Sequence, residues 1–240
     1  MRSVAVLIAA LGGLSSAALP TAMMEMPDEF RAQTTRISVS GFGGKNKGSY
    51  AFLDYSGDFK RGESRLGVFD PLYVSSKGKS SFTFRDSQDA ATISAACEMT
   101  KKSVTVGIVT FDPKKMAYHC DFRSDKQLLE ARFILGHAKA SGLKESMLSR
   151  EMRAGEASMF GQQLVMRSVH KYQGSKLQSP SPVGYFLWSG EQLVAAVELT
   201  DVNPTFFVLS DLADDLRQSV LVASLALSVL RDPANSALED

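Results

Sequence analysis

The chain holds few side chains that catalyse reactions or bind metals. Its three histidines are His119, His137 and His170, and its two cysteines are Cys97 and Cys120. A zinc site needs several such ligands at short spacing, and a nucleophilic site needs a base beside the nucleophile. His119 lies in a strand-like run, where neighbouring side chains point to opposite faces and cannot converge. The histidines are therefore predicted to be structural, and neither a metal nor another cofactor is expected.

The short motifs of common enzymes are missing from the sequence. There is no G-x-S-x-G, no G-x-G-x-x-G leading into a helix, and no phosphate-binding loop. The run "GFGG" at 41–44 opens onto a strand-like segment, so it predicts a turn rather than a phosphate site at a helix N-terminus. A non-enzymatic protein is expected. The alternative is a secreted hydrolase of unrecognised type, in which His170 would act with Glu198 or Asp201.

Basic side chains occur in pairs between the strand-like runs. The pairs are Lys45 and Lys47, Lys60 and Arg61, Lys77 and Lys79, Lys101 and Lys102, and Lys114 and Lys115. Turns also carry lysines simply because they are solvated and because lysines protect sheet edges. The candidate ligands for a lipid headgroup are Lys45, Lys47, Lys60, Arg61, Lys101 and Lys102. The net charge of +1 predicts a local patch and no nucleic-acid partner.

The two cysteines pose a question of geometry. An oxidising compartment favours a disulfide between Cys97 and Cys120. If residues 104–109 form a strand between them in a plain meander, the cysteines lie two strands apart. That separation is roughly 9.6 Å, which exceeds the ~7 Å limit for bridging. The sequence leaves both states open, and a bond would imply that the strand order is not a plain meander.

The first 18 residues have the layout of a secretory signal peptide. Arg2 is followed by an apolar run at 4–14 and by small residues that include Ser16 and Ala18. An uncleaved anchor or a buried first strand is the alternative, but the run is shorter than the roughly 18 residues of a spanning helix. The mature protein is expected to be secreted or periplasmic.

The remaining chain predicts one domain at 37–233, between a flexible arm at 19–36 and a tail at 234–240. Its composition, 44% hydrophobic and 22% charged, is that of a globular protein. About a dozen short runs alternate between apolar and polar residues, among them "SYAFLDY", "RLGVF", "SFTFR", "SVTVGIVT", "AYHCDF" and "GYFLW". Turn signals such as "SGDFKRGES" and "SSKGKS" separate them. Residues 136–160 fit either a short helix or a charged hairpin.

The chain finishes on a predicted helix at 211–231. Its signals are a cap at Ser210 or Asp211, Asp214 and Asp215 in the first turn, and Arg231 and Pro233 at the far end. Residues 219–230, "SVLVASLALSVL", are apolar on every side, which is typical of a helix buried in protein or membrane. Twelve residues span roughly 18 Å, short of the ~30 Å hydrocarbon core. A dozen strands wrapped around this helix would bury it.

That arrangement resembles the tubby-like fold of tubby proteins, phospholipid scramblases and LURP-one-related proteins. The resemblance lies in the order of "GQQLVMRSVHKYQGS", "VGYFLWSGEQLVAAVEL" and the closing helix, and it covers residues 37–232. It implies a mainly β fold, a closed antiparallel β-barrel of about twelve strands around a C-terminal hydrophobic helix. The alternative is a β-sandwich with one packed helix.

The resemblance also implies a function. Tubby proteins hold phosphoinositide headgroups with basic side chains, although none of those residues maps individually onto this chain. The expectation is an exported, non-enzymatic binding module that recognises lipid headgroups or a protein partner through its outer surface. Scramblase activity is not expected, because no spanning helix follows the signal peptide.

Overall fold

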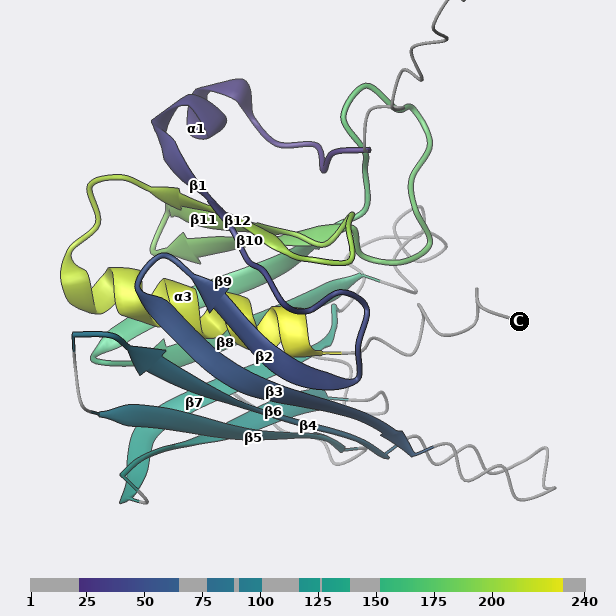
Figure 1. Cartoon of the computed structure of the whole chain (residues 1–240). Helices are drawn as coiled ribbons and strands as arrows, with labels where there is room; N and C mark the ends of the chain where they lie inside the picture. Colours follow the sequence, from purple (N-terminus) through teal and green to yellow (C-terminus); the bar gives the residue numbers. More distant parts are fainter. Residues whose placement is uncertain are drawn as a thin grey trace, which may run out of the picture.

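The computed structural model describes residues 22–64, 77–88, 91–100, 117–125, 127–138 and 152–230. The elements are α1 (Asp28–Gln33), β1 (Thr34–Ser38), β2 (Lys47–Phe52), β3 (Tyr55–Ser64), β4 (Lys77–Asp86), β5 (Thr92–Thr100), β6 (Ala117–Ser124), β7 (Gln127–His137), β8 (Arg153–Met159), β9 (Gln162–Val169), β10 (Gly184–Ser189), β11 (Gln192–Glu198), β12 (Thr205–Leu209) and α3 (Asp214–Val229). Figure 1 shows the strands curving around α3.

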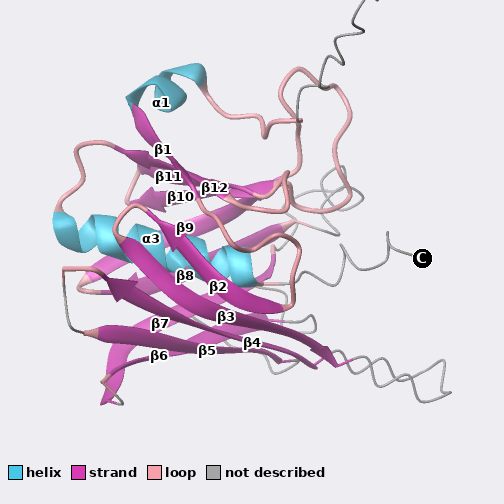
Figure 2. Ribbon diagram, viewed as in Figure 1, coloured by secondary structure: helices cyan, strands magenta, loops and turns pink. Residues whose placement is uncertain are grey.

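The twelve strands form one antiparallel sheet that is nearly closed into a barrel (Figure 2). Strands β2 to β12 follow each other as a plain meander, and β1 pairs with β12. Neighbouring side chains of a strand point to opposite faces of the sheet, so a strand with one solvated face shows period-two burial. In β6, for example, Tyr118, Cys120 and Phe122 are buried while Asp121 and Arg123 are exposed. The predicted β-barrel is confirmed.

The two ends of the sheet meet at a short seam between β1 and β2. Only Ser40 and Ala51 pair there, through N–H···O distances of 2.9 and 3.2 Å. The next residue, Gly41, has a φ of +95°, and a Cβ added to it would lie 2.1 Å from the carbonyl oxygen of Ser49. Only glycine fits this close approach. The turn then inserts Phe42, which is fully buried, beneath the seam.

Helix α3 lies in the lumen of the barrel. It contacts β3, β4, β8, β9, β11 and β12, which lie on different sides of the helix (Figure 1). Every side chain from 219 to 229 is buried. The predicted central helix is therefore confirmed, and the β-sandwich alternative is wrong because it would leave one flank of the helix exposed.

Helix α3 is shorter than predicted, at 214–229 rather than 211–231. Its N-cap is Ala213, whose methyl side chain cannot accept a hydrogen bond from the first turn. The predicted cap at Ser210 or Asp211 is therefore wrong. The serines of the helix remain compatible with the dry lumen because each hydroxyl bonds a carbonyl one turn earlier. Ser219, Ser224 and Ser228 donate to the carbonyls of Asp215, Val220 and Ser224 at 2.7 Å each.

One predicted turn is a strand. The sequence "SGDFKRGES" predicts a turn at 56–64, but these residues form most of β3, and β4 likewise begins inside the predicted turn "SSKGKS". The two strands approach so closely that a Cβ on Gly57 would lie 1.8 Å from the carbonyl oxygen of Thr83. The glycines and charges that suggested a turn therefore serve a tightly paired strand. Gly57 is needed because β3 pairs so closely with β4 at this point.

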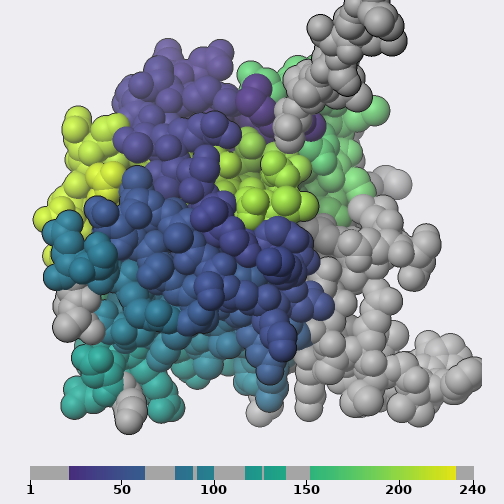
Figure 3. Space-filling model, viewed as in Figure 1, coloured from purple at the N-terminus to yellow at the C-terminus, as the bar shows by residue number. Residues whose placement is uncertain are grey.

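The arm predicted at 19–36 is ordered where the structure describes it. Residues 22–36 contain α1 and the start of β1, and they bury Met24, Met26 and Phe30. The backbone N–H of Met24 donates to the carboxylate of Glu198 at 3.1 Å, and α1 contacts β12. Figure 3 shows this purple segment against the yellow-green strands β10 to β12. The sequence predicts a flexible arm here, whereas the structure shows apolar side chains of this segment packed on the sheet.

Several predictions fall outside the described residues. These are the signal peptide at 1–18, the strands "RLGVF" and "SVTVGIVT", the tail, and Arg231 with Pro233. For residues 136–160 the sequence left a helix and a hairpin open. Within this region, Arg153–Met159 form strand β8. No helix among the described residues is long and apolar enough to cross a bilayer.

Candidate functional site

An exposed pair of lysines marks the outer face of the barrel beside the seam. Lys47 in β2 lies directly opposite Lys60 in β3, and both side chains are exposed. Lys45 is also exposed, in the turn that leads into β2, where its backbone N–H donates to the carbonyl of Phe42 at 2.9 Å. We call Lys45, Lys47 and Lys60 the lysine surface. None of the three has an ion-pair partner in the described part of the chain.

The lysine surface costs stability unless something neutralises it. Directly opposite residues of an antiparallel pair have Cβ atoms about 5 Å apart, and like charges at this distance repel. A carboxylate on the same face of β3, Asp58, is already engaged. It accepts hydrogen bonds from Ser49 and Arg85, and these two bonds lower the pKa of Asp58. The lysines therefore present unmatched positive charge to the solvent.

The other predicted basic pairs do not extend this surface in the same way. Lys79 is exposed in β4, but it lies opposite Glu98 of β5, which supplies a negative charge. Lys77 begins β4 opposite Ser64. Lys101 and Lys102, like Lys114 and Lys115, lie outside the described residues.

Arg61 belongs to the interior rather than to the lysine surface. The alternation of β3 turns Lys60 outward and Arg61 inward. The guanidinium donates from Nη2 to the carbonyl of Ser228 at 2.7 Å and lies 4.8 and 5.3 Å from the ring centres of Phe42 and Phe59. It thus places positive charge at the C-terminal end of α3, where the helix dipole favours it. The sequence predicts Arg61 in an exposed turn with Lys60, but the structure places it in β3 with its guanidinium bonded at the end of α3.

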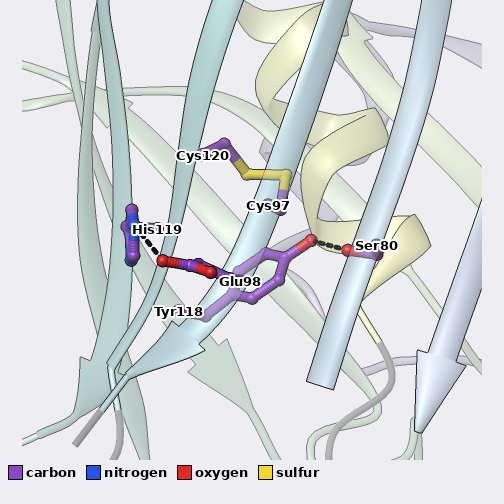
Figure 4. Close-up of a disulfide and its surroundings, with 6 residues drawn as sticks. All are labelled: Ser80, Cys97, Glu98, Tyr118, His119 and Cys120. Carbon is purple, nitrogen blue, oxygen red and sulfur yellow. Dashed lines mark hydrogen bonds and ion pairs between the residues drawn. A yellow bond between two sulfur atoms is a disulfide. The ribbon is translucent and has the colours of Figure 1, made fainter. Parts of the chain in front are cut away.

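Cys97 and Cys120 form a disulfide between the facing residues of β5 and β6 (Figure 4). The two strands pair directly, so no strand lies between them, and the sheet remains a plain meander. The premise that a strand separates the two cysteines in the sheet is therefore wrong, and so is the expectation that a bond requires another strand order. Residues 104–109 themselves lie outside the described residues. Next to the bond, the Tyr118 hydroxyl lies 2.6 Å from that of Ser80, and burial raises the pKa of Tyr118.

A histidine and a carboxylate face each other on the opposite face of the two strands that the disulfide joins. His119 Nε2 lies 3.5 Å from Glu98 Oε1 (Figure 4). His119 Nδ1 is buried and has no hydrogen-bond partner among the described residues. Sequence reasoning missed Glu98 because the two residues are distant in sequence. The sequence did contain a signal, because Glu98 follows Cys97 and His119 precedes Cys120. In an antiparallel pair that sets the two cysteines opposite each other, these two neighbours also lie opposite each other.

The remaining histidines lie at the barrel end where α3 finishes. His137 ends β7, and its Nδ1 lies 3.0 Å from Nη1 of Arg153. His170 follows β9, and its Nε2 lies 2.9 Å from the hydroxyl of Ser168, a residue that the sequence did not single out. Of the two carboxylates proposed for it, Glu198 accepts from the Met24 N–H and the Thr200 hydroxyl. The described residues include no group of three or more acidic, histidine or cysteine side chains able to hold a metal.

Comparison with protein-family models, with curated proteins and with solved structures yields no match to this chain. The functional interpretation therefore depends on the geometry of the chain itself.

Proposed function

We propose that this protein is an exported binding module of tubby-like architecture that binds the anionic headgroups of membrane lipids at the lysine surface. The observation that carries the proposal is the facing pair of Lys47 and Lys60, exposed and without acidic partners. A phosphate between them would relieve their repulsion and gain charge-assisted hydrogen bonds. Lys45 lies in the adjoining turn, where it can add a third positive charge.

The filled lumen supports a site on the outside of the barrel. Because α3 occupies the interior and its side chains from 219 to 229 are buried, the barrel has no room for a large internal ligand. Ligands must then bind the outer surface or the ends. The lysine surface is such an outer site.

The disulfide supports export. Disulfides persist in oxidising compartments and are rare in the cytosol. Cys97 and Cys120 are bonded, and both side chains are buried. Together with the signal-like first 18 residues, the bond favours a secreted or periplasmic protein. Intact-mass measurement of protein from its native host would show loss of these residues.

Vesicle binding tests the lipid partner. The mature protein is sedimented with phosphatidylcholine vesicles that contain or lack an anionic lipid such as phosphatidylserine. The variant Lys47→Gln/Lys60→Gln is expected to bind anionic vesicles about 30-fold more weakly, since each basic residue near the surface contributes about 1 kcal/mol. The matched control Lys171→Gln/Lys176→Gln removes the same charge from another loop and should bind as the parent does.

Three outcomes would contradict the proposal. The parent protein could fail to prefer anionic vesicles, or the lysine variant and the control could weaken equally. Alternatively, inorganic phosphate at matched concentration could displace the protein completely, which would identify free phosphate as the ligand. A protein partner with an acidic surface would appear as salt-dependent binding that vesicles do not compete for.

A further inference from the structure

A serine and a histidine are held together at the end of the barrel where α3 finishes. Ser168 lies near the end of β9, and His170 follows two residues later. The Ser168 hydroxyl is 2.9 Å from His170 Nε2, and His170 Nδ1 is 3.0 Å from the carbonyl oxygen of Ser179. The backbone N–H of Arg153, at the start of β8, donates to the same hydroxyl at 2.8 Å. Three separate segments therefore fix the serine and the imidazole.

These contacts determine which atom carries each hydrogen. A carbonyl oxygen only accepts hydrogen bonds, so in the neutral imidazole Nδ1 carries the hydrogen and donates it to Ser179. His170 Nε2 then presents a lone pair toward Ser168. Because the Arg153 N–H already occupies one lone pair of the serine oxygen, the hydroxyl hydrogen is free to point at Nε2. This is the arrangement of a serine nucleophile, its general base and the group that orients the base.

The surroundings favour negative charge at the serine oxygen. Of Arg153, the backbone N–H is the group that reaches the dyad, and it donates to the Ser168 hydroxyl at 2.8 Å. A directed N–H stabilises developing negative charge on an oxygen better than water does. Ser168 is buried, with 8% of its surface exposed, whereas His170 beside it is partly exposed, so any access from solvent to the pair is on the imidazole side.

We infer that Ser168 is a nucleophile that His170 activates toward carboxylic esters. The serine oxygen attacks the ester carbonyl carbon and forms the acyl–oxygen bond while its proton passes to His170 Nε2. The bond to the alcohol oxygen breaks, and the alkoxide takes that proton. Water then attacks the acyl carbon and gives a proton to Nε2. The bond between the acyl carbon and the serine oxygen breaks, and that oxygen recovers the proton. One ester and one water yield one acid and one alcohol.

This inference goes beyond lipid binding and does not depend on it. Ser168 lies in β9, whereas the lysine surface belongs to β2, β3 and the turn before them. Loss of either activity would leave the other intact. The sequence alone favours a structural His170, because the partner it suggests is a carboxylate and the one found is a serine two residues away.

A fluorophosphonate probe tests the nucleophile directly. The serine oxygen attacks phosphorus, fluoride leaves, and the proton is released through His170, so a covalent adduct remains. The native, disulfide-intact protein is expected to carry this adduct on Ser168, located by peptide mass spectrometry, and heat-denatured protein is not. His170→Gln can still accept a hydrogen bond but cannot act as the base, so labelling should slow at least about 100-fold.

The control is Ser175→Ala, which removes a hydroxyl from the same loop and should be labelled at the parental rate. Ser168→Ala should lose the adduct, and thermal unfolding shows whether that variant is folded. Because the adduct is located in the parent protein, the test still works if a variant fails to fold. Absence of an adduct on Ser168 in the native parent would overturn the inference, and so would unchanged labelling of a folded His170→Gln protein.

Discussion

Replacing Leu221, Leu225 or Leu227 by aspartate is expected to abolish folding. The three side chains point in different directions from α3, and all are fully buried. An aspartate at any of them would place an unpaired charge in the dry lumen, at a cost of more than ~4 kcal/mol. That cost is a large part of the stability of a typical domain. Circular dichroism and thermal unfolding of the three purified variants measure the effect.

The matched control is Leu177→Asp, because Leu177 is 80% exposed in the loop between β9 and β10. Its free energy of unfolding should lie within about 0.5 kcal/mol of the parent value. If two of the three lumen variants fold and melt near the parent, the central position of α3 is wrong. The argument that the lumen is filled would then no longer support an outer site.

Removing the disulfide is expected to lower the free energy of unfolding by about 3 kcal/mol. The bond joins residues 23 positions apart, and the entropy that it removes from the unfolded chain grows with this separation. Chemical denaturation of the parent and of Cys97→Ala/Cys120→Ala compares the two stabilities. A reductant should destabilise the parent and leave the double variant unchanged.

Thiol counting controls this second prediction. The denatured parent should expose no free thiol without reductant and two after reduction. Two free thiols in untreated mature protein, or a reductant that leaves parental stability unaltered, would contradict the bond and weaken the case for export.

The fold could be predicted because its signals are local. Alternating runs such as "AYHCDF" specify strands whatever their partners are, and a helix without a polar face, at 219–230, must be enclosed. The position of β3 could not be predicted in this way. In the sequence, Gly57 and Gly62 are typical of a turn. The close approach of the β4 backbone, which explains both glycines, becomes visible only in the tertiary structure.

The candidate sites were harder to predict because they depend on register. The sequence shows Lys47, Lys60 and Arg61 as basic residues near turns, but only the pairing of β2 with β3 sets the two lysines opposite each other and turns the arginine inward. Similarly, the sequence suggests Glu198 or Asp201 as the partner of His170. Its ring is oriented toward Ser168 by the loop after β9, which folds back so that the Ser179 carbonyl contacts the other ring nitrogen.

Lysine acetylation on vesicles tests the proposed headgroup site most directly. The mature protein is treated with an amine-reactive acetylating reagent on neutral and on anionic vesicles, and each lysine is followed by mass spectrometry. Anionic vesicles should slow the modification of Lys45, Lys47 and Lys60, while Lys171 and Lys176 react at the same rate on both. Equal slowing of all five lysines, or slowing of Lys171 and Lys176 alone, would contradict the lysine surface as the binding site.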